Sequence, residues 1–174
     1  MLTMRQGIRS LFTSISELVR RGQQGFSAPL SPGEDGRPRA RITVVGLAIG
    51  GEDRRVLSTV SSRSQWNVLF ADTCEKARAV ADQLRAPVIL CDRDLPGEDW
   101  RNVVEALASS PHRTCIVLVS KVVDEYLWNE TVQRGGYDVL SKPLREEDVV
   151  RVVRLAWSYW NTARRGAARP ATHR

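Results

Sequence analysis

The chain has 174 residues, of which 42% are hydrophobic and 26% are charged, as is typical of one folded domain with flanking segments. No apolar run is long enough to span a membrane, and polar residues interrupt the N-terminal stretch too often for a signal peptide. The net charge is +6, but residues 42–161 carry 15 basic and 17 acidic side chains. The basic excess therefore belongs to the flanks and bears on solubility rather than on the fold.

Few residues are suited to disulfides or transition metals. The three cysteines are odd in number and widely spaced, and the two histidines lie far apart in the sequence. We therefore expect free thiols in a reducing compartment, which predicts a cytoplasmic protein without a transition-metal cluster.

The two flanks differ in composition from the central part of the chain. Residues 1–21 are predicted to form an amphipathic helix, because apolar side chains recur with helical period from Ile8 to Val19. Residues 22–40 are rich in Gly, Pro, Ser and Gln, which favours a flexible linker. Residues 162–174 are predicted to be a basic, disordered tail. We expect neither flank to hold a DNA-binding or enzymatic output domain.

Between the flanks, residues 41–161 alternate between short apolar runs and segments with helical periodicity. Strands are predicted at Ile42–Leu47, Val68–Ala71, Pro87–Cys91, Cys115–Val119 and Tyr137–Leu140. Helices are predicted to begin after Gly50-Gly51, at a capping box of Asp72 and Glu75, near Glu98, around Tyr126 and after Pro143. Five such units predict an α/β fold with a doubly wound, five-stranded parallel sheet.

Polar side chains stand at or just beyond the ends of three predicted strands. Asp92 follows the third strand, Ser120 follows the fourth, and Lys142 comes shortly after the fifth. Because the carboxyl ends of parallel strands lie along one edge of the sheet, where ligands bind, we expect these side chains to form a site.

These residues also carry a family resemblance. Residues 42–161 resemble the receiver domain of bacterial two-component response regulators, through Asp92 followed by Leu95-Pro96-Gly97, through Ser120, and through the segment from Gly135 to Lys142-Pro143. The resemblance implies a flavodoxin-like (βα)5 fold of strand order 2-1-3-4-5. It also implies a phosphorylation-driven switch rather than an enzyme.

The resemblance assigns a role to each residue of the predicted site. It implies that Asp92 is the phosphoacceptor, that Ser120 donates a hydrogen bond to a phosphoryl oxygen, and that Lys142 supplies a positive charge, with a cis bond to Pro143. It further implies a phosphorelay protein whose partner is a histidine kinase or a phosphotransfer protein. Because the flanks are too short for an output domain, we expect a stand-alone receiver. The face of the fourth helix, fifth strand and fifth helix is the expected place for a homodimer.

The chain departs from the family pattern at the metal site. Receivers carry an acidic pair after the first strand that holds Mg²⁺, but Ala48 and Ile49 occupy those positions here. Asp92 and Asp94 remain as ligands, so we expect at most weak Mg²⁺ binding. The nearby Glu52 and Asp53 could substitute for the pair only if the loop were rebuilt and the next helix shortened by a turn. We favour the interpretation that they form the acidic start of that helix.

Two further departures flank the site. Val139 stands where receivers usually have an aromatic residue, and Arg93, next to Asp92, is interpreted either as a substitute for a missing cation or as a solvated loop side chain. The site therefore leaves two functions open. One is an atypical, phosphorylatable receiver. The other is a pseudo-receiver that binds proteins without phosphorylation. A nucleotide-binding enzyme is disfavoured, because the glycines from Gly46 to Gly51 do not form GxGxxG.

Overall fold

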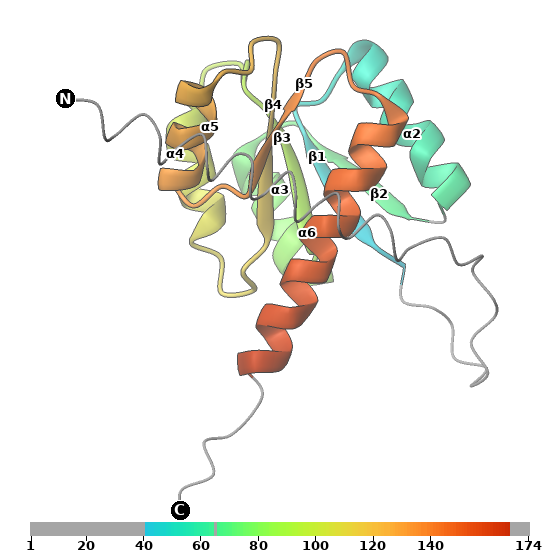
Figure 1. Ribbon diagram of the computed structural model, residues 1–174, viewed down its shortest axis with the longest axis vertical. Coiled ribbons are helices and arrows are strands. Elements are labelled where there is room, and N and C mark those ends of the chain that lie inside the picture. Colours follow the sequence, from blue (N-terminus) through green and yellow to red (C-terminus); the bar gives the residue numbers. More distant parts are fainter. Residues whose placement is uncertain (1–40, 65, 168–174) are drawn as a thin grey trace, which may run out of the picture. The chain divides into compact units, whose positions relative to one another are not determined.

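The computed structural model describes residues 41–64 and 66–167, so the helix predicted within residues 1–21 and the linker of residues 22–40 lie outside the described part. In the described part five strands alternate with five helices (Figure 1). The strands are β1 (Thr43–Leu47), β2 (Asn67–Ala71), β3 (Val88–Asp92), β4 (Cys115–Ser120) and β5 (Asp138–Ser141). The helices are α2 (Gly51–Ser64), α3 (Cys74–Leu84), α4 (Trp100–Ala108), α5 (Glu125–Gln133) and α6 (Glu146–Ala167). None of these helices is both long and apolar enough to cross a bilayer.

The strands form one parallel sheet of order β2-β1-β3-β4-β5, which confirms the predicted fold class. The register pairs Val44 of β1 with Val88 of β3, and Val88 with Cys115 of β4. All five strands therefore end at the same edge, which we call the carboxyl edge. The opposite edge, where the strands begin, is the amino edge.

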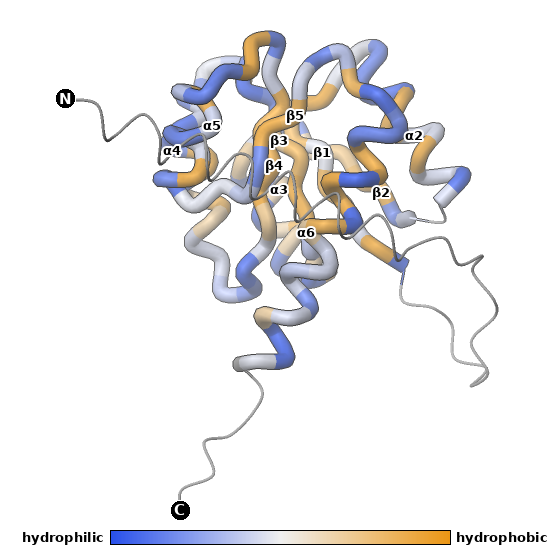
Figure 2. The backbone as a smooth tube through the Cα atoms, in the orientation of Figure 1, coloured by the Kyte–Doolittle hydropathy of each residue, from blue (hydrophilic) through white to orange (hydrophobic). Residues whose placement is uncertain are grey.

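Helices cover both faces of the sheet, with α2 and α6 on one face and α3, α4 and α5 on the other. Side chains of β3 alternate between the two layers, since Val88 and Leu90 belong to the first core and Ile89 and Cys91 to the second. Figure 2 shows the result as a hydrophobic sheet enclosed by helices with hydrophilic outer faces. The central strands are thus buried on both sides, as their continuous apolar sequences predict.

Two helix ends differ from the prediction. The start of α3 is capped by Thr73, whose hydroxyl accepts a hydrogen bond from the Lys76 N–H at 3.3 Å, so the predicted capping box at Asp72 is wrong. Thr73 is the last residue with extended backbone before the helix, and this is the position from which a side chain reaches the free amide groups.

Helix α6 continues to Ala167, so the predicted disordered tail is wrong for residues 162–167, while residues 168–174 lie outside the described part. Alanine and arginine in this stretch are good helix formers. The guanidinium of Arg164 also stacks over the ring of Trp160 at 4.4 Å, and Arg164 and Arg165 complement the helix dipole in its last turn.

Candidate functional site

Asp92 is the last residue of β3 and is only 5% exposed. Its Oδ1 accepts a hydrogen bond from the Asp94 N–H at 3.0 Å, and its Oδ2 is bonded to the Nζ of Lys142. The peptide bond between Lys142 and Pro143 is cis, as predicted. A buried carboxylate needs such partners, because removing a charge from water costs several kcal/mol. The structure thus brings the predicted carboxylate and amine into contact.

Ser120 ends the neighbouring strand β4 and is buried. Its hydroxyl donates to the Val122 carbonyl oxygen at 2.7 Å and accepts from the Val122 N–H at 3.2 Å. Backbone bonds tie this strand end to the other two, since the Arg93 N–H donates to Val119 and the Lys142 N–H donates to Ser120, both at 2.9 Å. The three predicted residues therefore share the carboxyl edge, but the Ser120 side chain is engaged in its own loop.

A second carboxylate, that of Asp53, belongs to the site, although we favoured the interpretation that it merely begins a helix. It lies in the first turn of α2, with its side chain 13% exposed. Its Oδ1 accepts from the Leu144 N–H at 2.8 Å, and its Oδ2 lies 3.9 Å from the Nζ of Lys142. The prediction holds for Glu52, which is exposed and pairs with Arg55 at 2.8 Å. Lys142 thus stands between two carboxylates.

The sequence does carry a signal for Asp53. Positions 53, 57 and 60 follow the i, i+4, i+7 spacing of one helix face, and Leu57 and Val60 are the buried residues of α2. A carboxylate in line with the buried stripe of a helix points toward the protein, whereas one on the outer face points to solvent.

The positions of the missing acidic pair have other tasks. Ile49 is 3% exposed and packs in the core together with Leu57 and Val60. Ala48 adopts a positive φ of 56° and donates its N–H to Ala71 at 2.9 Å. These two residues turn the chain from β1 into α2 and offer no carboxylate to the site.

Comparison with known proteins agrees with this geometry. The sequence model for the response regulator receiver domain matches residues 52–154, which is more than half of the chain. The chain belongs to the response regulator receiver family. No curated protein matches it significantly.

Solved receivers share the fold at low sequence identity. The chemotaxis protein CheY4 of Vibrio cholerae is 20% identical, with a TM-score of 0.61 over 67% of this chain and 99% of CheY4. The receiver domain of an HD domain-containing protein from Pseudomonas fluorescens is 16% identical, with a TM-score of 0.65 over 76% of this chain and 98% of its own. NtrX from Brucella abortus is 16% identical, with a TM-score of 0.64 over 73% of this chain and 29% of NtrX. The receiver domain assigns the chain to two-component signalling and implies contact with kinases or phosphotransfer proteins.

The site offers oxygen donors of the kind that Mg²⁺ takes. Within residues 41–64 and 66–167, no three His, Cys, Asp or Glu side chains are arranged to bind a metal. The oxygen donors are the carboxylates of Asp53 and Asp92 and the main-chain carbonyl of Asp94, two residues after Asp92. Mg²⁺ is commonly held by one or two carboxylates together with phosphate and water, so this donor set fits it. Lys142 occupies both carboxylates and competes with a cation for them.

The other two departures from the receiver pattern are also placed. Val139 is buried in the core beside α4 and α5. Arg93 is half-buried and bonds Val119 through its main chain, while its guanidinium makes no ion pair with Asp92 or with any other described residue. This favours the interpretation of Arg93 as a loop side chain over that of a substitute cation.

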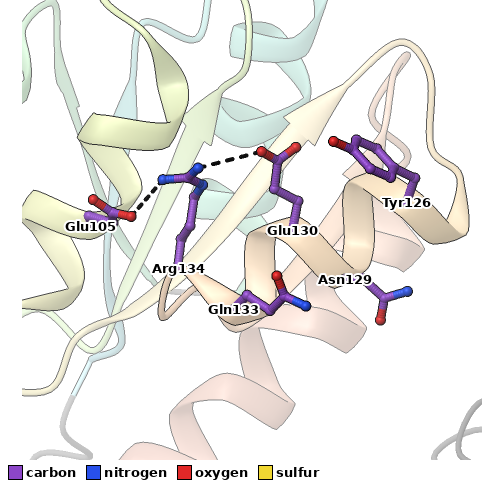
Figure 3. A pocket seen from close by; sticks show the side chains of 6 residues that line it. All are labelled: Glu105, Tyr126, Asn129, Glu130, Gln133 and Arg134. Carbon is purple, nitrogen blue, oxygen red and sulfur yellow. Dashed lines mark hydrogen bonds and ion pairs between the residues drawn. The ribbon is translucent and has the colours of Figure 1, made fainter.

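A separate groove lies between α4 and α5, and its charges are already paired. Figure 3 shows the guanidinium of Arg134 between Glu105 and Glu130, at 2.6 and 3.6 Å. Arg101 also bonds Glu130, and this hydrogen bond holds the pKa of Glu130 below its usual value. The groove is further lined by Tyr126, Asn129 and Gln133. We interpret this network as a clamp between two helices, since each ionised group has a partner of opposite charge.

Proposed function

We propose that this receiver accepts a phosphoryl group on Asp92 in a two-component phosphorelay. The observation that carries the proposal is the buried Asp92 carboxylate at the carboxyl edge, held by the Lys142 ammonium and by the Asp94 N–H. A carboxylate fixed in this way has one orientation toward an incoming donor. Positioning of this kind accounts for much of the catalysis of phosphoryl transfer.

In the proposed step, a carboxylate oxygen of Asp92 attacks the phosphorus of a phosphohistidine on the donor protein. The phosphorus–nitrogen bond breaks, its electron pair returns to the imidazole, which takes up a proton from solvent, and an acyl phosphate forms on Asp92. The ammonium of Lys142 stabilises the negative charge of the transferring group. The hydroxyl of Ser120 turns away from Val122 and donates to a phosphoryl oxygen.

The proposed Mg²⁺ ligands are the carboxylates of Asp53 and Asp92 and the main-chain carbonyl of Asp94. The ion, when bound, neutralises charge on the phosphoryl oxygens. Before it binds, each carboxylate has to give up part of its contact with Lys142, so we expect affinity to be low. Asp53 replaces only one of the two carboxylates that receivers place after the first strand.

The test is incubation of the purified protein with a small acyl phosphate donor and Mg²⁺, followed by measurement of the intact mass. We expect slow addition of one phosphoryl group, no addition to Asp92→Asn, and slower addition to Asp53→Asn. Glu52→Gln is the matched control, because Glu52 is the exposed neighbour of Asp53 and should leave the rate unchanged. Modification of Asp92→Asn to the wild-type extent would refute the assignment of the phosphoacceptor.

The second candidate function is a pseudo-receiver that binds partners without phosphorylation. It is favoured by one observation, that Lys142 and Ser120 are already engaged by Asp53 and Val122. If neither a small donor nor a set of histidine kinases modifies the protein, while a partner binds wild type and Asp92→Asn equally, this function replaces the first.

We further propose a cytoplasmic receiver that is a signalling protein rather than an enzyme. The described residues hold one receiver domain, and all three cysteines are free thiols, as in a reducing compartment.

We propose a homodimer through the face of α5, β5 and α6, where Tyr126 and Tyr159 are exposed. Sedimentation equilibrium of wild type and Tyr126→Arg tests it, and a monomer at all concentrations would contradict it.

A further inference from the structure

The amino edge, on the side of the sheet opposite Asp92, gathers five exposed arginines. We call them the arginine edge, and they are Arg41, Arg85, Arg113, Arg164 and Arg165. Three of them sit at one level before adjacent strands. Arg41 and Arg85 each lie three residues before the paired Val44 and Val88, and Arg113 lies two residues before Cys115, the partner of Val88.

Hydrogen bonds and a cation–π contact connect segments that carry these arginines. The Thr114 hydroxyl donates to the Ala86 carbonyl oxygen at 3.0 Å, which joins the loop of Arg113 to the loop of Arg85. The indole N–H of Trp160 donates to the His112 carbonyl oxygen at 2.8 Å, and Arg164 stacks over the same indole. Figure 1 shows the end of α6 projecting past the sheet at the edge where β1 begins. The segments that carry Arg85, Arg113 and Arg164 are therefore in contact with one another.

The charge of this surface is not neutralised from within the domain. None of the five arginines forms an ion pair with another residue of the described part. The nearby carboxylate of Asp82 is bound by the Ser110 hydroxyl at 2.7 Å and by Arg78 at 3.9 Å. Acidic residues gather instead in the first turns of α2, α3, α5 and α6, at the carboxyl edge. The nearly neutral domain is thus electrically polarised, with a basic edge opposite the phosphoacceptor.

The backbone gives a second, independent observation. Arg85 and Arg113 have positive φ angles of 50° and 52°, a conformation that glycine adopts freely. For a residue with a side chain this conformation costs about 1–2 kcal/mol. Of the three non-glycine residues with positive φ in the described part, two carry the arginine edge. Glycine would relieve this cost at both positions, so the fold alone does not favour the two arginine side chains.

We propose that the arginine edge binds the anionic headgroups of a lipid bilayer, with the carboxyl edge turned away from the membrane toward signalling partners. Clusters of basic side chains attract anionic lipid by about 1 kcal/mol for each residue near the surface. The sequence before Arg41 supports lipid over nucleic acid. It combines an apolar stripe of helical period with Arg5, Arg9, Arg20 and Arg21, a pattern typical of interfacial segments.

A single-stranded nucleic acid is disfavoured by the composition of the edge. Proteins that bind such strands offer exposed aromatic rings on which bases stack. Trp66 and Trp160 are both buried, and the exposed ring of Tyr159 packs against that of Tyr137, with centroids 5.5 Å apart. Binding to an anionic bilayer requires basic side chains on an accessible surface but no exposed aromatic rings. Stable peripheral anchoring combines two separate signals, here one basic and one apolar.

The experiment uses the full chain and sedimentation with vesicles of phosphatidylcholine, with or without phosphatidylserine. We expect binding only to the anionic vesicles, and its loss at high salt. Arg85→Gly with Arg113→Gly should weaken binding about 25-fold, at about fivefold per arginine, without lowering the melting temperature. Arg164→Gln with Arg165→Gln should weaken binding to a similar extent through the other end of the surface.

The control pair removes two positive charges from the carboxyl edge, where the acidic residues gather. Arg55→Gln with Arg145→Gln changes exposed residues paired with Glu52 and Glu147, and should weaken binding less than threefold. Equal losses in the control and the arginine-edge variants would show attraction by net charge alone and overturn the proposal. It would also be overturned by absence of binding to anionic vesicles, or by tighter binding to a nucleic acid at the same salt concentration.

Discussion

The sharpest test of the site compares two adjacent acids in the first turn of α2. In Asp53→Ala the N–H of the buried Leu144 loses its acceptor at 2.8 Å, and Lys142 loses one of its two carboxylates. An unsatisfied buried donor costs about 1–3 kcal/mol. In Glu52→Ala only an exposed ion pair is lost, which is worth about 0.3–0.5 kcal/mol. Both variants lose an acid near the helix N-terminus, so that effect largely cancels.

We therefore expect Asp53→Ala to be about 2 kcal/mol less stable than Glu52→Ala. With a typical dependence on urea this lowers the midpoint of unfolding by about 1 M, measured through fluorescence of the buried Trp100 and Trp160. Asp53→Asn retains an acceptor and removes repulsion from Asp92, so its loss should stay below about 1 kcal/mol. Equal midpoints for the two alanine variants would refute the placement of Asp53 in the site.

Three further predictions concern the fold. Val117→Asp places an unpaired carboxylate in the central strand β4, on a fully buried position, and should cost several kcal/mol, so a wild-type urea midpoint would contradict the strand. A Cβ at Gly136 would lie 2.8 Å from the Thr131 carbonyl oxygen, whereas Gly166 has no atom within 4 Å. Gly136→Ala should therefore lower the melting temperature. Gly166→Ala should raise it, because alanine in a helix is more stable than glycine by about 0.5–1 kcal/mol. Burial raises the pKa of Tyr137 from 10.0 to about 12. The folded state then holds this proton to higher pH than the unfolded state. The contribution of Tyr137 to stability is therefore constant below pH 10 and falls as pH rises from 10 to about 12, and Tyr137→Phe should flatten that fall in a series of urea midpoints.

The strands and the site edge were predictable because they depend on local sequence. The runs Val88–Asp92 and Cys115–Ser120 are apolar up to their last residue, and a strand buried on both faces needs such a run. The two glycines after α5 end that helix, since a Cβ at Gly136 would strike the preceding turn. Once five parallel strands are known, the placement of Asp92 and Ser120 at one edge follows from topology.

The features that the sequence did not predict depend on contacts between distant residues or on local backbone conformation. Asp53 reaches the site through a hydrogen bond to Leu144, 91 residues later, and that contact depends on how α2 packs beside the β5–α6 loop. The cap of α3 was a choice between adjacent residues, Asp72 and Thr73, decided by backbone conformation alone. The strained positions of Arg85 and Arg113 are equally invisible, because arginine has no preference for positive φ.

The relocated carboxylate explains how a receiver can lack its usual acidic pair and still have a route from Asp92 to the rest of the domain. An acid at Ile49 would be buried among apolar side chains, so the turn after β1 cannot simply regain the pair. Asp53 enters from α2 and is anchored to the main chain of Leu144, in the segment that leads into α6. On our proposal, a phosphoryl group on Asp92 draws Lys142 away from Asp53, because the new anion carries more charge than the carboxylate it replaces. Asp53 then keeps only its hydrogen bond from Leu144. Lys142 and Leu144 belong to the same β5–α6 loop, so the loop changes conformation when Lys142 moves toward the phosphoryl group while Leu144 stays bound to Asp53. The same loop begins α6, so on this proposal a phosphoryl group on Asp92 would act on the helix whose far end carries Arg164 and Arg165.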